Sequence, residues 1–241
     1  MNRIALLLAG AMISLACIFV ACSHAAGDNN QLTSQEKEAG WILLFDGKST
    51  KGWHIYHEGD IPSAWSVRDG ELYCDPASKA FHGDLVSDSE FENFELQFDW
   101  KITRGGNSGV FINVVERPDI PYTWSSGAEY QLLDVNHPDF PDSTKRSGCL
   151  FGFAPQLHPV ANKPTGEWNH SRIIHQNGKV EFYLNGTLTV QQDFTSQAWR
   201  DWVAQTHFKD SPEFTKHTSG HIALQEWSRG IAFRNIKLKP L

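Results

Sequence analysis

Apolar and polar residues alternate along most of the chain after Trp41. The segment 94–102, FELQFDWKI, places its large apolar residues on one face and charged or amide residues on the other. A period of two is typical of an antiparallel strand with one face on a core. The segment SGVFINVV at 108–115 and the stretch near Trp41 are further strands, so the pattern predicts ten or more.

Turn signals divide the remaining alternating stretches. WSVRDGELYC at 65–74 predicts a strand, an Asp-Gly turn and a strand, and 171–190 carries two Asn-Gly turns between three strands. Two more strands flank a loop within 220–238. Only 196–208, SQAWRDWVAQTHF, has helical spacing. No fixed repeat is present, so the pattern favours an all-β sandwich of two antiparallel sheets with one short helix over a propeller.

The N-terminus has the pattern of an export signal. Residues 1–21 contain one charge, at Arg3, and a long apolar run, which predicts a signal peptide. FVAC at 19–22 resembles a lipoprotein cleavage box, which would make Cys22 the lipidated first residue. A single membrane anchor and ordinary cleavage after His24-Ala25-Ala26 are the alternatives.

The rest of the chain divides into a linker and one domain. Residues 22–38 are polar and aperiodic, which predicts a flexible tether, and 39–241 form the domain. We therefore expect an exported protein, either anchored in the outer membrane as a lipoprotein or periplasmic. The absence of acidic residues directly after Cys22 favours the periplasmic side.

Charge and cysteine content narrow the function. The chain has 28 acidic and 21 basic residues and a net charge of −7, and no basic stripe or nucleic-acid motif is present, which argues against a nucleic-acid partner. We expect contact with a membrane only through the lipid anchor. Outside the signal, Cys74 and Cys149 do not fit a zinc spacing. They form either a disulfide or two small buried hydrophobes.

The segment 127–134, GAEYQLLD, carries the strongest candidate chemistry. Glu129 and Gln131 share one face of a strand, and alternation in HIALQE puts His221 and Gln225 together on another. If the two strands lie in one sheet, these side chains form a polar patch suited to sugar hydroxyls. A solvated sheet face is the plain alternative.

Other polar clusters carry weaker signals. Asp134, His137 and Asp139 combine metal-ligand types without a known spacing, and Asp134 also suits a turn. Glu167 and Asn169 in GEWN either line a groove or shape a turn. There is no G-x-S-x-G elbow. No cofactor is firmly implied, and a divalent metal is left open.

Several blocks in order resemble the 3-keto-disaccharide hydrolase family. They include WILLFDGKSTKGWH, FELQFDWKITRGGNSGVFI, GAEYQLLD and SGHIALQEWSRGIAFRNIKL, and the similarity covers about 41–241. The resemblance implies a concanavalin A-like jelly roll. It also implies an exported enzyme that cleaves 3-keto-glycosides by elimination and hydration.

Residue by residue, the resemblance implies two sets of site residues. The catalytic candidates are Glu129, Asp134, Glu167 and His221. The substrate-binding candidates are Gln131, Lys145, Arg146, Asn169, Gln225 and Trp227. Lys145 or Arg146 would stabilise an enolate. The family usually has LQDHG where this chain has LQEWS, so Trp227 replaces an imidazole and either alters the catalytic set or adds a stacking surface.

Two other functions are compatible with these residues. An ordinary glycosidase would need Glu129 to face Asp134 or Glu167 across about 5 to 9 Å. A non-catalytic, lectin-like carbohydrate-binding module would use the same fold without turnover.

Overall fold

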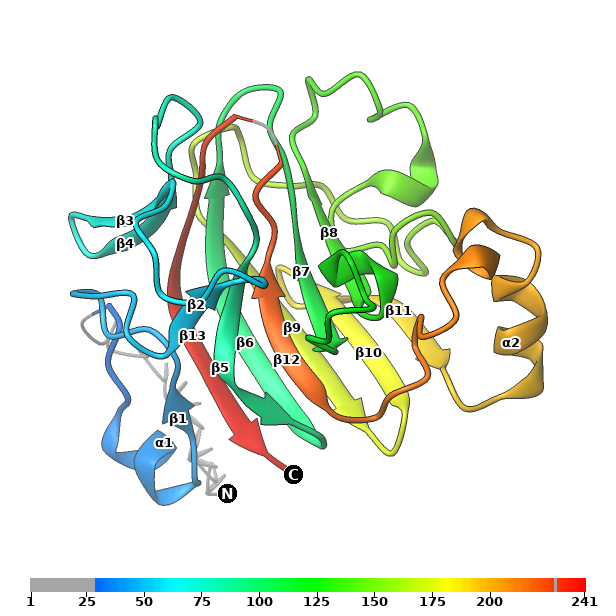
Figure 1. Ribbon diagram of the computed structural model, residues 1–241. Coiled ribbons are helices and arrows are strands. Elements are labelled where there is room, and N and C mark those ends of the chain that lie inside the picture. Colours follow the sequence, from blue (N-terminus) through cyan, green and yellow to red (C-terminus); the bar gives the residue numbers. More distant parts are fainter. Residues whose placement is uncertain (1–28, 228) are drawn as a thin grey trace, which may run out of the picture.

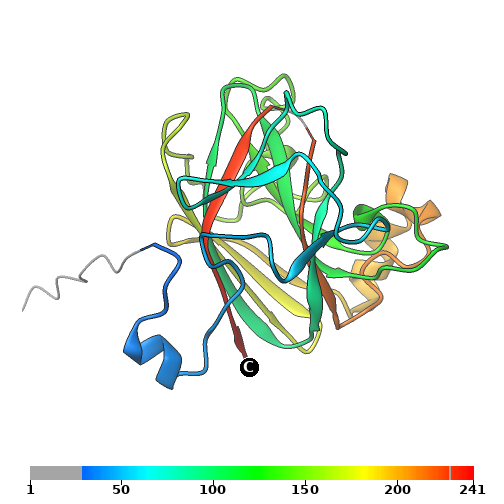
Figure 2. The ribbon, with the colours of Figure 1, turned by 60° about the vertical axis from the view of Figure 1, so that its left-hand side comes forward.

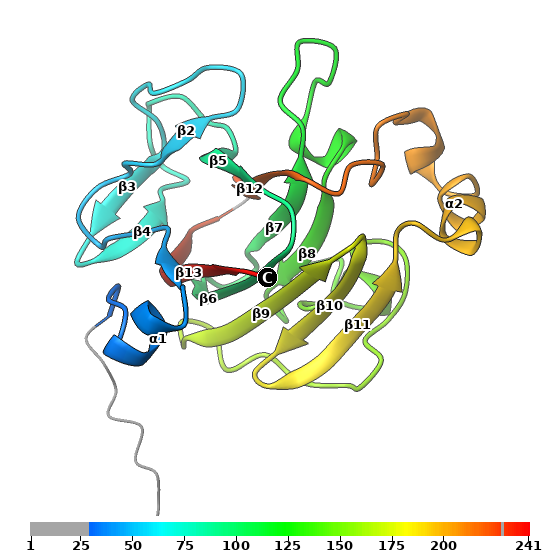
Figure 3. The same cartoon turned by 90° about the horizontal axis from the view of Figure 1, so that it is seen from below.

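Two antiparallel sheets pack face to face. The computed structural model describes residues 29–227 and 229–241, so the predicted signal peptide 1–21 and Cys22 lie outside the described residues. The strand order is β11-β10-β9-β6-β13-β4-β3 in the larger sheet, with β1 also paired to β13, and β2-β5-β12-β7-β8 in the smaller. Figure 3 shows the larger sheet curving round the smaller one. The predicted two-sheet sandwich is confirmed.

The element bounds follow the predicted alternation and turns. The larger sheet contains β1 (Ile42–Leu43), β3 (Trp65–Arg68), β4 (Glu71–Cys74), β6 (Phe94–Ile102), β9 (Asn169–Gln176), β10 (Lys179–Leu184), β11 (Thr187–Asp193) and β13 (Ile231–Pro240). The smaller sheet contains β2 (Trp53–Ile55), β5 (Leu85–Phe91), β7 (Asn107–Val114), β8 (Ala128–Leu133) and β12 (Gly220–Leu224). Short helices are α1 (Ser34–Glu38), α2 (Gln197–Val203) and the 3-10 turns η1 (Thr123–Ser125), η2 (Ser143–Lys145) and η3 (His207–Asp210).

The core lies between the sheets. Strand β6 buries every second residue, as its alternation predicts. From the smaller sheet, Tyr130 reaches this layer, where its ring meets Phe98 edge-on at 5.6 Å. Its hydroxyl lies 2.8 Å from that of Ser171. Burying each such side chain contributes about 1.5–3 kcal/mol, so the inward face of β8 is firmly anchored.

The helical segment near the C-terminus is shorter than predicted. Ser196 caps α2, which ends at Val203, and the chain turns before η3 begins at His207. Trp199 and Phe208 pack into the apolar core from these two pieces. Apolar spacing alone therefore predicted one helix over 196–208, whereas the structure has two short helices separated by a turn. Within the described part of the chain, none of the helices has the length and hydropathy needed to cross a membrane.

The predicted flexible tether is wrong for its described part, 29–38. Thr33 forms a capping box with Glu36 at the start of α1, a second helix that the sequence did not predict. Asn30 is buried and exchanges hydrogen bonds with Asn235 while donating to the Gly70 carbonyl. These bonds tie the start of the segment, drawn in blue at the edge of the molecule in Figure 2, to the domain. The composition predicted a linker because it contains no information on hydrogen bonds to residues far away in the sequence.

The two described cysteines do not form a disulfide. Cys74 and Cys149 are both buried free thiols. Burial raises the pKa of the Cys149 thiol to about 11. Both residues therefore act as small apolar side chains in the core, and the disulfide alternative is wrong.

Candidate active site on the outer face of the smaller sheet

Strand β8 presents Glu129 and Gln131 on the face that points away from the core. The backbone register puts Gln131 opposite Gly109 of β7 and Glu129 opposite Phe111. On the other side of β7, directly after the end of β12, the backbone amide of Gln225 donates to the Gly109 carbonyl. Since β12 and β8 lie in one sheet, the structure brings Glu129, Gln131 and Gln225 together.

This face is not open, as a solvated sheet face would be. Glu129 is only 8% exposed and Gln131 only 1%. Beside them, Tyr56, Val86, Phe111, Val114 and Ala223 form a small apolar cluster on the same face. This carboxyl group and this amide are therefore largely shielded from water. Burying a charge or an unpaired amide costs free energy unless a ligand supplies the missing hydrogen bonds, so the pair is a candidate binding site.

Asp84 completes the acidic site. It immediately precedes Leu85, which pairs with Leu224. Leu85 faces the core, so Asp84 points to the outer face beside Gln225. Its carboxylate accepts hydrogen bonds from the Thr123 hydroxyl and from the Glu226 amide at 2.8 Å. Burial raises the pKa of Asp84 to about 6, although these two donors oppose the rise.

Glu129 is an acid without a protein partner. In the described part of the chain its carboxyl group forms no hydrogen bond or ion pair. Burial, and then the negative charge of Asp84, raise its pKa well above the usual value. Gly109 makes room for it, because a Cβ atom there would lie 2.8 Å from Cδ of Glu129. Such a group can donate a proton, or act as a strong base once ionised.

The neighbouring amides are suited to holding hydroxyl groups. Nε2 of Gln131 donates to Oδ1 of Asn107 at 2.9 Å. Oε1 of Gln131 is buried and has no partner among the described residues. Gln225 lies across Gly109 from it. The Glu129 carboxyl thus lies over Gly109, and Gln131 and Gln225 flank this glycine on the two neighbouring strands.

Asp134 stands apart from this group and has a structural task. Its carboxylate accepts from the Gly105 amide at 2.7 Å, the Thr165 hydroxyl at 2.6 Å, and the backbone and side chain of Asn136. Burial raises its pKa, but the donors outweigh burial and hold the pKa below the usual value. The carboxylate thereby ties three loop segments together. The structure does not bring it to Glu129.

Glu167 and Asn169 lie at the start of β9 in the other sheet. Asn169 is buried, and its Oδ1 accepts from the Lys163 amide and from Nδ2 of Asn185. Glu167 is exposed beyond it. These two residues shape a turn, which is the plainer of the two sequence interpretations.

Lys145 and Arg146 are engaged within their own loop. Nζ of Lys145 lies 3.3 Å from Oδ2 of Asp139. Arg146 donates to the Phe140 carbonyl, and its guanidinium lies over the Phe140 ring. The structure pairs neither cation with Glu129, so it lends no contact to the expected enolate role.

His221 faces the outer side of β12 but turns away from β8. A register shift separates it from Ala223. Nδ1 donates to the Ser87 carbonyl and Nε2 lies 3.5 Å from Glu90, both on β5. Because β5 lies on the opposite side of β12 from β7, the imidazole is directed away from Glu129. Its ring meets that of His54 edge-on at 6.1 Å.

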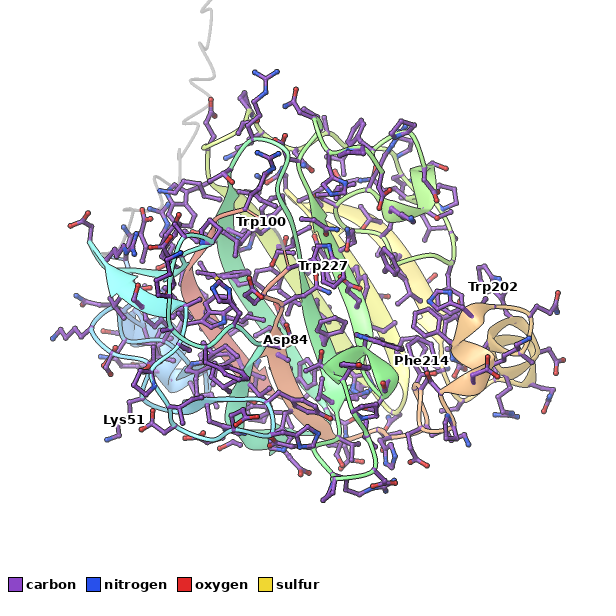
Figure 4. The ribbon with its side chains drawn as sticks, turned by 45° about the horizontal axis from the view of Figure 1, so that its top comes forward. Lys51, Asp84, Trp100, Trp202, Phe214 and Trp227 are labelled. Carbon is purple, nitrogen blue, oxygen red and sulfur yellow. The ribbon has the colours of Figure 1, made fainter. Side chains whose placement is uncertain are left out.

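Trp227 follows β12 and is 66% exposed. It comes directly after Glu226, whose backbone amide donates a hydrogen bond to the Asp84 carboxylate. Figure 4 shows Trp227 and Asp84 over the same part of the smaller sheet. The predicted stacking surface therefore borders the site.

The possible metal centre at Asp134, His137 and Asp139 does not form. Nδ1 of His137 accepts from the Asp139 amide at 3.1 Å, while Asp134 is saturated as described above. Over residues 29–227 and 229–241, no three His, Cys, Asp or Glu side chains converge in a way that would hold a metal ion.

Comparison with known sequences identifies the family of this chain. The profile of the 3-keto-alpha-glucoside-1,2-lyase-like domain matches residues 40–239. The chain belongs to this family. A 3-keto-disaccharide hydrolase of Bacteroides thetaiotaomicron is 31% identical over 229 residues, which cover 84% of this chain and 79% of that protein.

Solved structures carry the same fold. A candidate glycosyl hydrolase of Parabacteroides distasonis superimposes with a TM-score of 0.81 at 31% identity, covering 88% of this chain and 99% of that one. A second such protein from the same organism gives 0.64 at 27% identity, covering 83% and 99%. The jelly-roll expectation for this family member is thereby confirmed.

Sequence reasoning missed three residues of the site in this family member. Asp84 stands just before a short apolar strand in GDLV, and Thr123 lies in a proline-rich loop. Gly109 appears only as a small residue in SGVF. The one available signal was the Asp ahead of a buried strand, and it becomes meaningful only when β5 is known to neighbour β12.

Proposed function

We propose that this member of the 3-keto-alpha-glucoside-1,2-lyase-like family cleaves the glycosidic bond of 3-keto-glycosides, with hydrolysis as the net result. Family membership supports the coarser conclusion that the chain is an enzyme acting on glycosidic bonds. The name of the Bacteroides relative supports the choice of 3-keto-sugars.

The chemistry needs one well-placed acid–base group. A ketone at C3 acidifies the proton on C2, so a base removes that proton and leaves an enolate. The enolate then expels the oxygen on C1, which leaves with a proton as an alcohol, and a C1–C2 double bond conjugated to the ketone remains. Water adds across this bond and returns the C2 proton.

Glu129 is the residue that we assign to the C2 proton. The observation that carries the proposal is its buried carboxyl group, which has a raised pKa, no partner in the described chain and a glycine beneath it. In its ionised form such a carboxylate is a stronger base than an exposed one. Gln131 and Gln225 are placed to bind hydroxyls, and Trp227 to stack on a sugar ring.

A carboxyl pair also supports a second candidate, an ordinary glycosidase. Burial raises the pKa of both Asp84 and Glu129, and two neighbouring carboxyl groups, of which one is protonated and one ionised, suit an acid and a base. This candidate predicts cleavage of unoxidised glycosides. A lectin-like module predicts binding without turnover.

One assay separates the three functions. Purified protein is incubated with nitrophenyl α-glucoside and with its 3-keto form, and nitrophenol release is followed. Release from the keto form only, lost in Glu129→Gln, is expected. Deuterium should enter C2 when the reaction runs in D₂O. Release from the unoxidised glucoside without C2 exchange would favour the glycosidase, and release from neither would favour the binding module.

The cellular location is proposed from residues 1–22 alone. We propose export and lipid attachment at Cys22, facing the periplasm. Labelling of cells with a radioactive fatty acid should mark the wild-type protein and not Cys22→Ser.

A further inference from the structure

A cavity at the edge of the molecule lies apart from the Asp84–Glu129 site. Its walls come mainly from α2, from η3 and from residues 211–218, which lead from η3 to β12. Its volume is about 490 Å³, which is in the usual range for a small-molecule site. Figure 4 shows Phe214, which borders this cavity, beside α2 and away from Asp84. The described residues that line the cavity include none of those in the site on the smaller sheet.

The inner wall of the cavity is aromatic. Phe194, Trp199, Phe208 and Phe214 all border it. The rings of Phe208 and Phe214 stack with centroids 4.0 Å apart and planes 11° apart, and the Trp199 ring lies 5.1 Å from that of Phe194. All four side chains belong to the apolar core, so their positions are fixed in the absence of a ligand. A preformed aromatic wall of this kind suits an apolar ring.

One residue of the wall has an unusual backbone conformation. Thr215 has a φ of 54°, in the left-handed region that β-branched residues rarely adopt. Two contacts hold it there: its amide donates to the Ser126 carbonyl at 2.8 Å, and its hydroxyl accepts from the Trp199 indole at 2.8 Å. Backbone strain persists only where the surrounding structure enforces it, and it is concentrated at functional sites. The strain at Thr215 is therefore a second indication, independent of the cavity's shape, that this wall has a function.

The charged residues of the cavity are all basic. Arg200, Lys209, Lys216 and His217 line it, and the described lining contains no Asp or Glu, although the whole chain has a net charge of −7. Glu213, the acid closest to Lys216 in the sequence, pairs with His217 at 2.6 Å and with neither lysine. Basic groups beside an aromatic wall are complementary to an anion that carries an apolar body.

We propose that this cavity is a second binding site of the protein, which takes a small carboxylate with an apolar ring. The ring packs against Phe208 and Phe214, and the carboxylate group lies near Lys209 and Lys216. A neutral ligand of the same shape gains nothing from the two ammonium groups, and a cationic ligand is repelled by them. The site is independent of the proposed function, because it shares no described residue with the Asp84–Glu129 site.

Calorimetric titration with three probes of similar shape tests the site. The probes are 3-phenylpropionate, 3-phenylpropanol and 3-phenylpropylamine, which share a ring and a chain and differ in charge. We expect the carboxylate to bind about tenfold or more tightly than the alcohol, and the amine not to bind. Lys209→Gln and Lys216→Gln should each weaken binding of the carboxylate about threefold and leave that of the alcohol unchanged. Lys51→Gln, which removes an exposed lysine at the opposite edge of the molecule in Figure 4, is the matched control.

A variant that fills the cavity shows where the probe binds. Ala204 lines the cavity and is exposed directly after α2, so Ala204→Trp should melt like the wild type and abolish binding of the carboxylate and the alcohol. Glu129→Gln should bind the carboxylate like the wild type, whatever its effect on turnover. Undiminished binding by Ala204→Trp, or loss of binding by Glu129→Gln, would overturn the proposal. Equal affinities for the carboxylate and the alcohol would also overturn it, and so would the absence of binding by all three probes.

Discussion

Replacing Asp84 by Asn is expected to stabilise this protein at neutral pH. The buried carboxyl group has a pKa of about 6 in the folded state against 3.8 for an ordinary Asp. Asn fits the same space: its carbonyl accepts from the Glu226 amide, and its amide donates to the Thr123 hydroxyl. The substitution therefore removes an ionisation that burial disfavours while it keeps both hydrogen bonds.

The magnitude follows from the pKa difference. A rise from 3.8 to about 6 corresponds to about 3 kcal/mol lost on ionisation. Because the residue as a whole keeps some contact with solvent, we take the lower figure of about 2 kcal/mol for the gain. For a chain of this length, that raises Tm by about 4 to 8 °C.

The sign depends on pH. The native state keeps the Asp84 proton to higher pH than the unfolded state, so wild-type stability falls as pH rises from about 4 through about 6 and then levels off. Below pH 4 the wild type and Asp84→Asn should melt alike. Above pH 7 the variant should melt higher by the full amount.

Thermal melts of both proteins at pH 4, 5, 6 and 7.5 provide the test. Asp69→Asn, in the exposed β3–β4 turn, serves as a control and should show no such trend. A Tm difference that is the same at every pH, or that favours the wild type at pH 7.5, would refute the reasoning. The loss of the Asp84 charge should also lower the pKa of Glu129 and move the acidic limb of the turnover profile to lower pH.

Three further perturbations test other contacts. Gly109→Ala should displace the Glu129 carboxyl, which should lower the free energy of unfolding in urea by about 1–3 kcal/mol and remove most of the activity. The double variant with Glu129→Asp should regain stability, because the shorter side chain leaves room for the methyl group. No regain would count against the steric explanation. His54 is partly buried, but its bonds to Glu116 and Asp88 raise its pKa, so it stabilises the fold most below about pH 6.5 and less as pH rises through its folded pKa. His54→Gln should therefore reduce the loss of unfolding free energy over this pH range by about 0.5–1 kcal/mol. An unchanged loss would mean that other groups cause it. Asn30→Ala should cost about 1–3 kcal/mol and speed proteolysis within 29–38, whereas unchanged cleavage would mean that the segment is held elsewhere.

The sequence by itself determined the strands and the direction of their side chains. Alternation in 94–102 and at 128–133 fixes which residues face the core, because successive side chains of a strand point to opposite faces. The Asp-Gly and Asn-Gly turns likewise mark where one strand ends and the next begins, since those residues tolerate positive φ. Placing Glu129 and Gln131 on one face needed no tertiary information.

Only the tertiary structure decided which strands are neighbours and what covers them. Asp84, Glu129 and Gln225 meet because β5, β12, β7 and β8 lie side by side, an order that local periodicity does not encode. The same order turns His221 toward β5 and leaves Glu167 on the other sheet. Burial in the folded chain and the charge of Asp84 then raise the pKa of Glu129, because desolvation depends on every segment packed nearby and not only on the strand that carries the residue.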